Sequence, residues 1–277
     1  MRLWVRSLNT IESVFNVLEV IVVTDCNNVG IISSQVERET VLITGGGSGL
    51  GRSLVEMFRN AGYNVAFTYR KHRESIDELV ESSGGSIFAV QADASDYTQV
   101  CDSVKDIVNC FGSINVLINN AASARDASLE NSNPDDFDYT VRNVLYPVYY
   151  YSKAVLTFMR STRRGKIINI GSVNGLHGRE GSIAYSASKA AIVGLTKTMA
   201  KELGKYPINC NVVAPGYIAT DGQSKTSELI KKLVLSECYI KRLSEPEAIC
   251  NMVMFLASHQ ADNITGQVFQ VDCGQYI

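Results

Sequence analysis

The chain has 277 residues, of which 45% are hydrophobic and 19% are charged, and its formal net charge is -2. This composition suits one large domain better than two small ones, and it leaves ample apolar material for a core. A nearly neutral chain has no general attraction to nucleic acid or to an anionic membrane, so the sequence predicts neither as a partner.

The cysteines and histidines give no metal-binding pattern. The seven cysteines are widely scattered and form no C-x-x-C pair. The three histidines, His72, His177 and His259, do not stand near a cysteine at the spacing of a zinc site. We therefore expect reduced thiols, a cytoplasmic protein and no bound metal.

Residues 1–38 form an extension that lacks the pattern of the rest of the chain. The apolar run at residues 14–23 is short and is interrupted by polar residues, so it cannot cross a bilayer as a helix. Arg2 and Arg6 before it resemble the start of a signal or transit peptide, but no small-residue cleavage site follows. The extension has no assigned role, and we expect it to pack on the domain or on a partner subunit.

From Thr40 onward, short β-branched runs alternate with longer helical stretches. The strand-like runs fall at residues 41–43, 64–68, 86–91, 116–118, 166–170, 209–213 and 268–271. Several are apolar at consecutive positions, which is typical of parallel strands covered by helices on both faces. The pattern predicts a single α/β domain at residues 39–277, built on a doubly wound, seven-stranded parallel sheet.

The first run leads directly into the glycine-rich segment Thr44-Gly-Gly-Gly-Ser-Gly-Leu-Gly51, and we expect a helix to begin near Arg52. Glycines allow positive φ and let the backbone approach a pyrophosphate, whose charge is met by free N–H groups at the helix start. At the first strand-to-helix junction, the segment predicts a nucleotide-binding turn.

The segment AYSASKA places Tyr185 and Lys189 four positions apart on a predicted helix, so both project from one face. An ammonium beside a phenol favours the phenolate. We therefore expect Lys189 to lower the pKa of Tyr185 and to make it a usable acid near neutral pH. Ser172 lies thirteen positions before Tyr185, just after a predicted strand, where its hydroxyl can hydrogen-bond a substrate carbonyl.

The order and spacing of these motifs resemble the short-chain dehydrogenase/reductase family over about residues 40–277. The glycine segment follows the family's T-G-x-x-x-G-x-G pattern, and Asn143, Ser172, Tyr185 and Lys189 match its catalytic tetrad. The resemblance implies a Rossmann-type fold and hydride transfer between a nicotinamide and a carbonyl or alcohol carbon. It also implies that Tyr185 exchanges the proton, Ser172 positions the substrate, Lys189 tunes the phenol and Asn143 helps to hold a water.

The residues after the second strand, Tyr69-Arg70-Lys71, bear on the choice of cofactor. An acidic residue there would bind the ribose hydroxyls of NAD, whereas Arg70 can clamp the extra phosphate of NADP, so NADP(H) is favoured over NAD(H). The alternative is that Arg70 is only a surface residue at a strand end. The cofactor contacts that the resemblance implies are Thr44, Gly45, Gly47, Ser48, Gly49, Leu50, Gly51, Tyr69, Arg70, Asp93, Ala94, Asn120, Ala121, Ala122, Tyr185, Lys189, Pro215, Gly216, Ile218 and Thr220.

Three features concern the surroundings of this expected site. Residues 221 to about 239 match the family's mobile lid over the substrate. Ala122 stands where the family usually has glycine, which implies slight crowding of the cofactor floor. Cys273 also replaces a usual glycine, so we expect the geometry of that turn to differ.

Within the family, the chain most resembles β-ketoacyl-acyl-carrier-protein reductases, through its segments NNAASARD, GKIINIGS and VVAPG. This resemblance implies an NADPH-dependent reductase of 3-oxoacyl thioesters on acyl carrier protein. Arg163 matches a position that contacts the carrier protein in that subgroup. A solvated basic surface formed with Arg160, Arg164 and Lys166 is the alternative for Arg163.

Other functions stay open. The same tetrad would serve an oxidoreductase of a free alcohol or ketone, such as a steroid, a sugar or a secondary metabolite. Residues 178–184 lack the amide side chains that the carrier-protein subgroup often has before its tyrosine. An enoyl reductase is disfavoured because that branch spaces its tyrosine and lysine more widely, and a non-catalytic NADP-binding sensor is disfavoured by the complete tetrad.

The family also implies a homotetramer or a dimer. Its subunit contacts involve the helices that carry Asn143 and Tyr185. We expect the cluster of Tyr146, Tyr149, Tyr150 and Tyr151 to lie at such an interface.

Overall fold

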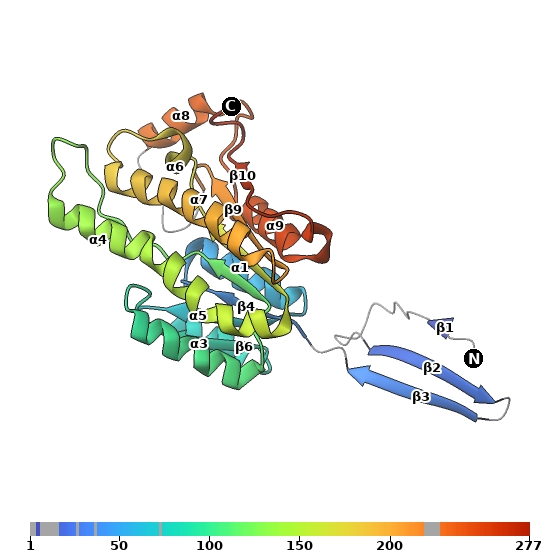
Figure 1. Cartoon of the computed structure of the whole chain (residues 1–277). Helices are drawn as coiled ribbons and strands as arrows, with labels where there is room; N and C mark the ends of the chain where they lie inside the picture. Colours follow the sequence, from blue (N-terminus) through green and yellow to red (C-terminus); the bar gives the residue numbers. More distant parts are fainter. Residues whose placement is uncertain (1–3, 6–16, 26–27, 36–37, 72–73, 219–227) are drawn as a thin grey trace. The chain divides into compact units, whose positions relative to one another are not determined.

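The computed structural model describes residues 4–5, 17–25, 28–35, 38–71, 74–218 and 228–277, and its side chains over 38–71, 74–218 and 231–277. The chain divides into two compact units, Met1–Arg38 and Glu39–Ile277, both drawn in Figure 1. The described strands of the first unit are β1 (Trp4–Val5), β2 (Val17–Asp25) and β3 (Asn28–Gln35), paired antiparallel in that order.

The second unit is built on one seven-stranded sheet with the order β10-β9-β8-β7-β4-β5-β6, and every pairing is parallel. Its strands are β4 (Thr40–Ile43), β5 (Asn64–Tyr69), β6 (Ile87–Gln91), β7 (Val116–Asn119), β8 (Gly165–Ile170), β9 (Ile208–Pro215) and β10 (Val268–Val271). Each predicted run matches one strand, with Ser86 alone falling outside. The predicted seven-stranded, Rossmann-type parallel sheet is therefore confirmed.

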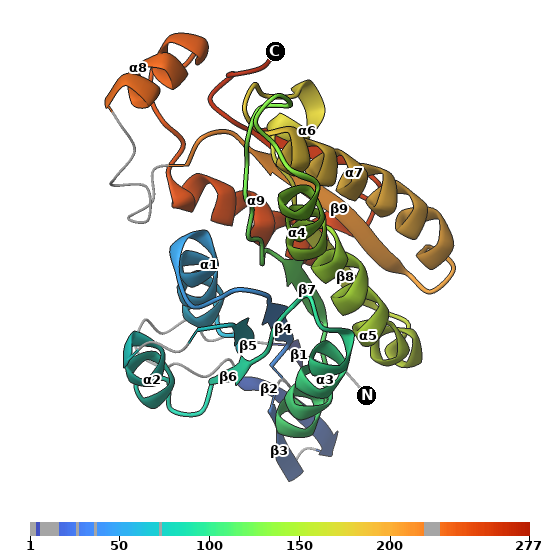
Figure 2. The same cartoon turned by 90° about the vertical axis from the view of Figure 1, so that its left-hand side faces the viewer.

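Helices cover both faces of this sheet. They are α1 (Gly49–Asn60), α2 (Glu74–Glu81), α3 (Tyr97–Phe111), α4 (Pro134–Val144), α5 (Tyr146–Thr162), α6 (Asn174–His177), α7 (Ile183–Leu203), α8 (Glu228–Glu237) and α9 (Pro246–Ala257), followed by a 3-10 turn at His259–Ala261. Helices α1, α2 and α9 pack on one face, and α3, α5 and α7 pack on the other (Figure 2).

The strand β4 shows why the sequence of a central parallel strand is apolar throughout. Val41 and Ile43 pack with the helices of one face, whereas Leu42, between them, packs with the helices of the other. All three side chains are fully buried. Because both faces are covered, no polar position alternates with the apolar ones.

Local signals set the ends of several helices. The Asp96 carboxylate accepts hydrogen bonds from the backbone N–H groups of Thr98 at 2.9 Å and Gln99 at 3.2 Å, which caps the start of α3. The same helix ends at Gly112, whose φ of 79° stops it. Asn133 caps α4 by accepting from the backbone N–H of Asp136. The two N-caps fix where the loops before α3 and α4 end, and Gly112 fixes where the loop after α3 begins.

The strand order creates a crevice at one edge of the sheet. The chain runs outward from β4 to β5 and β6, and then returns to β7 on the other side of β4. The connections after β4 and β7 therefore leave in opposite directions from neighbouring strands. In open α/β sheets, ligands bind at this switch point, beyond the carboxyl ends of the strands.

Candidate active site

The glycine turn after β4 is fixed by close backbone contacts. Gly45 has a φ of 69°, in the region that favours glycine. A Cβ atom on Gly51 would lie 2.2 Å from the carbonyl oxygen of Gly45 and 2.7 Å from Nδ2 of Asn120. The Thr44 hydroxyl accepts hydrogen bonds from the backbone N–H groups of Asn120 and Ala121, each at 2.9 Å. The turn is thereby tied to the end of β7.

Helix α1 starts inside this turn. Its first residue is Gly49, three residues earlier than the predicted start near Arg52, because the last glycines of the turn already have helical hydrogen bonding. Its N-cap residue, Ser48, makes no side-chain capping hydrogen bond. The N–H groups of the first turn therefore keep their capacity to bind an anion. The turn fits a pyrophosphate, since it presents backbone N–H donors that no side chain caps.

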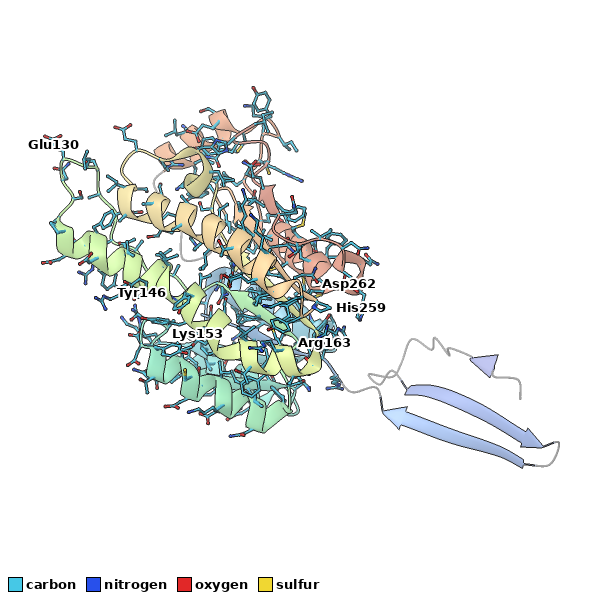
Figure 3. The ribbon with its side chains drawn as sticks, viewed as in Figure 1. Glu130, Tyr146, Lys153, Arg163, His259 and Asp262 are labelled. Atoms are coloured by element: carbon cyan, nitrogen blue, oxygen red, sulfur yellow. The ribbon has the colours of Figure 1, made fainter. Side chains whose placement is uncertain are left out.

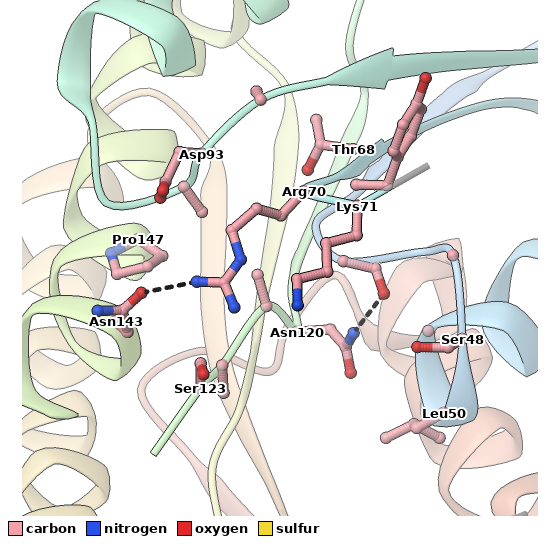
Figure 4. A pocket seen from close by; sticks show the side chains of 18 residues that line it. Ser48, Leu50, Thr68, Arg70, Lys71, Asp93, Asn120, Ser123, Asn143 and Pro147 are labelled. Carbon is pink, nitrogen blue, oxygen red and sulfur yellow. Dashed lines mark hydrogen bonds between the residues drawn. The ribbon is translucent and has the colours of Figure 1, made fainter. Parts of the chain in front are cut away.

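A pocket of about 330 Å³ lies at this edge of the sheet (Figure 4). It brings together twelve of the predicted cofactor positions: Gly45, Gly47, Ser48, Leu50, Gly51, Tyr69, Arg70, Asp93, Ala94, Asn120, Ala121 and Ala122. Asn143, predicted as a member of the tetrad, lines the same pocket from α4. The nucleotide turn and one tetrad position thus share a single cavity.

Sequence reasoning did not assign a role to five other residues that line this pocket, namely Thr68, Lys71, Ala92, Ser123 and Pro147. Four of them directly adjoin a predicted position: Thr68 and Lys71 flank the Tyr69-Arg70 pair, Ala92 precedes Asp93, and Ser123 follows Ala122. Extending each motif by one residue would have found these four. Pro147 comes from the start of α5, and no sequence motif pointed to it.

Two cations extend into the pocket from the end of β5. The side chains of Arg70 and Lys71 both point inward (Figure 4). Asp93 is the acidic side chain among the described lining residues, and its Oδ1 accepts hydrogen bonds from the backbone N–H and the hydroxyl of Ser95, at 2.9 and 2.7 Å. Positive charge at the β5 end and an engaged carboxylate beside it fit an anionic ligand group.

Tyr185 and Lys189 share one face of α7. Lys189 is 4% exposed, and its Nζ donates a hydrogen bond of 2.6 Å to the carbonyl oxygen of Ile170, the last residue of β8. The same Nζ lies 5.5 Å from the centre of the Tyr185 ring. Burial lowers the pKa of Lys189 to about 8. A buried amine next to a phenol is therefore able to change its protonation state close to neutral pH.

The predicted direction of the Tyr185 pKa is wrong in this structure. Burial raises the pKa of its phenol, a hydrogen bond with Ser172 acts in the opposite direction, and the Asp126 carboxylate adds to the rise. The cost of removing the phenolate from water is the largest of these effects. The Lys189 Nζ, 5.5 Å from the centre of the Tyr185 ring, does not reverse this direction.

The loop after β9 joins this catalytic group from the C-terminal side. The carbonyl of Pro215 accepts a hydrogen bond of 3.0 Å from the backbone N–H of Val173, the residue after Ser172. The N–H of Gly216 donates to the carbonyl of Val271 at 3.1 Å. Ile218 forms an isolated parallel bridge with Ser244. Thr220 and residues 221–227 of the predicted lid lie outside the described residues, and α8 follows them.

The pocket and the catalytic group are adjacent but distinct. Ser172, Tyr185, Lys189, Pro215, Gly216 and Ile218 are not among the described residues that line the pocket, and neither are Thr44 and Gly49. Asn143 connects the two parts: it lines the pocket, and the next residue of α4, Val144, packs with Ile192 of α7 in one buried cluster. The carbonyl of Asn143 also accepts the N–H of Ser123, at 3.3 Å.

The basic residues around Arg163 lie at the start of β8, whereas Ser172 follows its end. Figure 3 shows Arg163 near His259 and Asp262. Arg163 donates to the carbonyl of Lys205 at 3.3 Å. Two of its basic neighbours are ion-paired: Arg164 with Glu39, and Lys166 with Asp262 at 2.6 Å. Since a strand rises about 3.3 Å per residue, the six-residue β8 separates Arg163 from Ser172 by about 20 Å.

The tyrosine cluster is only partly available to a partner. The ring of Tyr150 lies 5.7 Å from that of Tyr146 and 5.9 Å from that of Tyr149, measured between ring centres. Tyr149 is 45% exposed, but Tyr151 is fully buried in the core formed by α3, α5 and α7. The expectation that Tyr151 lies at an interface is therefore wrong, because side chains two positions apart on a helix point about 200° apart, so Tyr151 faces the core while Tyr149 faces outward.

Some site types are missing from the described part of the chain. Among the described residues, no group of three or more His, Cys, Asp or Glu side chains is arranged to hold a metal ion. None of the helices in the described ranges is long and apolar enough to cross a membrane. The described cysteines, which are Cys101, Cys110, Cys210, Cys238, Cys250 and Cys273, are all free thiols; Cys26 lies outside the described residues.

Comparisons with known proteins match nearly all of the second unit. A family model described as enoyl-(acyl carrier protein) reductase matches residues 45–275. The 3-oxoacyl-[acyl-carrier-protein] reductase of Staphylococcus epidermidis is 36% identical over 243 residues, which are 87% of this chain and 100% of that protein. The enzyme of the same name from Staphylococcus aureus is 36% identical over 242 residues, 86% of this chain and 98% of its own.

The relative of that name from Thermotoga maritima is 35% identical over 246 residues, which are 88% of this chain and 100% of that protein. The matched region contains Gly45–Gly51 of the glycine turn, the residues that line the pocket and all four tetrad positions. The chain therefore belongs to the short-chain dehydrogenase/reductase family, and it is an NAD(P)-dependent oxidoreductase that acts on C=O or CH–OH groups.

Proposed function

We propose that residues 39–277 form a single NADP-binding domain that uses NADPH to reduce 3-oxoacyl thioesters on acyl carrier protein to 3-hydroxyacyl thioesters. The observation that carries this proposal is that the glycine turn, Arg70 and Ser172 each follow the carboxyl end of a parallel strand in one sheet. Ser172 is hydrogen-bonded to Tyr185, which shares a face of α7 with Lys189. Relatives from three bacteria that match over nearly their full length are named for this reaction. Residues 1–38 have no proposed role.

The residues of the chain have distinct parts in this reaction. When bound, the nicotinamide supplies the hydride. The Ser172 hydroxyl holds the substrate carbonyl by a hydrogen bond, and Tyr185 gives its proton to the carbonyl oxygen as the carbon is reduced. The Lys189 ammonium places positive charge beside the phenolate that remains. Asn143 helps to hold a water through which the proton is replaced.

The proposed cofactor contacts combine residues that line the pocket with positions that the resemblance to the family implies. The free N–H groups of the turn from Thr44 to Gly51 would hold the pyrophosphate. Arg70 and Lys71 would bind the additional phosphate that distinguishes NADP from NAD. Pro215, Gly216 and Ile218 would lie toward the nicotinamide. The role of Thr220 stays a prediction from the sequence.

The experiment that tests the reaction is oxidation of NADPH, followed by the absorbance of the reduced nicotinamide, with four classes of substrate. They are a 3-oxoacyl carrier-protein thioester, acetoacetyl-CoA, an enoyl thioester such as crotonyl-CoA, and free ketones. We expect turnover with both 3-oxoacyl thioesters and none with the enoyl thioester. Turnover with the enoyl thioester or with free ketones alone would overturn the proposal. Binding of NADPH without turnover of any substrate would favour a sensor.

We propose Arg163 as a contact for the acidic carrier protein. Its position, about 20 Å along β8 from Ser172, requires the acyl group to span this length or to enter the site of a second copy. Arg163→Ala should raise the KM for the carrier-protein thioester about three- to tenfold and leave the KM for acetoacetyl-CoA unchanged. The control is Lys197→Ala, which removes a positive charge from an exposed position of α7. An equal change for both substrates would exclude a carrier-specific contact.

We infer a homotetramer or a dimer in which the rings of Tyr146, Tyr149 and Tyr150 meet a second copy. The support is their mutual contact at a partly exposed surface of α5. Light scattering should give a mass of two or four chains, and the mass of one chain would contradict the inference. We also propose a cytoplasmic location, which the free state of the described cysteines supports.

A further inference from the structure

Helix α7, which carries Tyr185 and Lys189, begins without a side-chain cap of its own. Its N-cap residue, Ser182, makes no side-chain capping hydrogen bond. The N–H groups of a first helical turn have no acceptor within the helix, so an uncapped turn frays. Tyr185 is the third residue of α7 and therefore lies in this turn. The position of Tyr185 thus depends on acceptors from elsewhere in the chain.

Such acceptors come from the loop between β7 and α4, which runs beside the start of α7 (Figure 2). Oδ1 of Asp126 accepts a hydrogen bond of 3.3 Å from the backbone N–H of Tyr185. The carbonyl of Ala127 accepts a longer one, of 3.5 Å, from the N–H of Ile183. Asp126 stands 59 positions before Tyr185, so this cap is a tertiary contact that ties the first turn of α7 to a distant loop.

The loop is fixed in turn by α4, immediately before Asp126. The hydroxyl of Thr140, a fully buried residue, accepts a hydrogen bond of 2.9 Å from the N–H of Arg125 and donates one of 3.1 Å to the carbonyl of the same residue. The Arg125 guanidinium is ion-paired with Asp136 of α4 at 3.0 Å. Both polar backbone groups of Arg125 are therefore engaged, and the Asp126 side chain extends toward α7 from an anchored backbone.

The next turn of α7 is held by other contacts. The Nζ of Lys189 donates to the carbonyl of Ile170 at 2.6 Å. Helix α6 packs so closely on α7 that a Cβ atom on Gly175 would lie 2.6 Å from the carbonyl carbon of Lys189. Neither contact involves Asp126. Loss of its carboxylate should therefore loosen the turn that contains Tyr185 and leave Lys189 in place.

We propose that Asp126 is a positioning residue for the proton transfer: from the loop after β7 it holds the first turn of α7, and with it Tyr185, in the orientation that the reaction requires. This inference rests on the proposed function, since it takes Tyr185 as the proton donor. Small displacements of a reacting group slow the chemical step, so a loosened first turn lowers kcat. Asp126 is not among the described residues that line the cofactor pocket, so NADPH affinity should not depend on it.

The test compares Asp126→Ala with Asp126→Asn, by kcat for a 3-oxoacyl thioester and by the Kd of NADPH from nicotinamide fluorescence. Alanine removes the acceptor, whereas asparagine keeps an amide oxygen and caps helices as well as aspartate does. We expect kcat to fall about five- to twentyfold in Asp126→Ala and to stay within about threefold of the wild type in Asp126→Asn. The Kd of NADPH should stay within about twofold in both. The control, Asp138→Ala, removes a carboxylate from an exposed position of α4 and should keep wild-type kcat.

Two further measurements locate the effect. Hydrogen exchange of peptides that cover residues 183–186 should be faster in Asp126→Ala than in the wild type, while peptides from residues 193–203 of the same helix should be unchanged. In the Tyr185→Phe background, Asp126→Ala should leave the residual rate unchanged, because Asp126 acts through Tyr185.

Several results would overturn the inference. They are wild-type kcat in Asp126→Ala, an Asp126→Asn variant that is as slow as Asp126→Ala, and a loss of NADPH affinity that parallels the loss of kcat. A further loss of rate in the Tyr185→Phe background would also overturn it, since Asp126 would then act on another group.

The proposed function fails in a different way. A wild-type protein that reduces no 3-oxoacyl thioester loses the proposed reaction, and kcat is then compared on whichever carbonyl compound it does reduce. A wild-type protein that reduces the thioester, together with an Asp126→Ala variant of equal kcat, loses only the role of Asp126. Hydrogen exchange needs no substrate, so unchanged exchange at residues 183–186 overturns the role of Asp126 whether or not the thioester is reduced.

Discussion

The phosphate-binding end and the catalytic end of the site are stabilised by different means. At the phosphate-binding end, glycines permit close backbone approach, and the hydroxyl of Thr44 ties the turn to the end of β7. At the catalytic end, buried side chains hold the geometry, since Lys189 is 4% exposed and is hydrogen-bonded to the carbonyl of Ile170. One end is sensitive to added volume, and the other is sensitive to charge.

This difference has a consequence for stability. A turn built from backbone groups contains no charged group that must be removed from water, so its requirements are steric. A buried ammonium loses hydration, and its lowered pKa records that loss. We therefore expect the buried Lys189 ammonium, which the reaction needs, to lower the free energy of unfolding. We expect the glycine turn, in contrast, to tolerate almost no added atoms.

The largest expected effect comes from Gly51→Ala. The added Cβ would lie 2.2 Å from the carbonyl oxygen of Gly45, and backbone at that distance must move. We expect the NADPH Kd to rise at least about 100-fold, because the shifted turn no longer presents its N–H groups to the pyrophosphate. A fluorescence titration measures this.

The control for Gly51→Ala is Gly194→Ala on α7. An added Cβ at Gly194 meets no atom within 4 Å, so the same chemical change should leave NADPH affinity unchanged. Wild-type affinity in Gly51→Ala would contradict the steric explanation of the turn.

The next effect concerns stability. Lys189→Met should abolish turnover and yet stabilise the fold. The pKa of Lys189 falls from 10.5 to about 8, and 2.5 pKa units correspond to about 3 kcal/mol. Loss of the hydrogen bond to Ile170 offsets about 1 kcal/mol of this, so we expect a net gain of about 2 kcal/mol at pH 7. Denaturant unfolding measures it, and a destabilised variant would refute the cost assigned to burial.

The same lysine predicts a dependence of stability on pH. Between pH 8 and 10.5 the unfolded chain keeps the proton of Lys189 while the folded protein releases it, so the unfolded state binds more protons and the free energy of unfolding rises with pH. The advantage of Lys189→Met should therefore shrink over this range, by at most about 1.4 kcal/mol per pH unit. Unfolding curves of both proteins at several pH values test it; parallel curves would contradict it.

The smallest effect is at the turn after β10. Cys273 stands where the family usually has glycine. Its φ of 56° lies in the region that favours glycine, so the backbone of this cysteine is strained. Cys273→Gly should relieve this strain and stabilise the protein by about 1 kcal/mol, with little effect on turnover. Thermal unfolding measures the change. An unchanged or lower melting temperature would show that the contact between the Cys273 thiol and Ser244 outweighs the strain.

The fold was predictable because parallel strands that are buried on both faces have continuous apolar sequences. The runs at residues 116–118 and 268–271 lie within β7 and β10, respectively. The start of α1 was misplaced, because glycine signals a turn and does not reveal how many turn residues also belong to the helix. The local sequence pattern thus predicts that a helix or a strand is present, whereas the exact start of α1 depends on hydrogen bonding in the folded turn.

The site was predictable where its residues adjoin a motif, and less so where long side chains reach across it. The contact between Arg70 and Asn143 joins residues 73 positions apart, and no local pattern encodes it. The pKa of Tyr185 depends on how much protein surrounds the phenol, which the Y-x-x-x-K spacing does not state. Similarly, adjacent tyrosines of α5 differ completely in exposure, since Tyr151 faces the core.

The most direct test of the difference between the two ends is to measure NADPH affinity and turnover of a 3-oxoacyl thioester in Tyr185→Phe. Because only the phenolic oxygen is removed from the catalytic end, we predict that kcat falls about 1,000-fold while the Kd of NADPH stays within about twofold of the wild type. Retained turnover, or a loss of NADPH affinity that parallels the loss of turnover, would contradict the separation of the catalytic end from the phosphate-binding end.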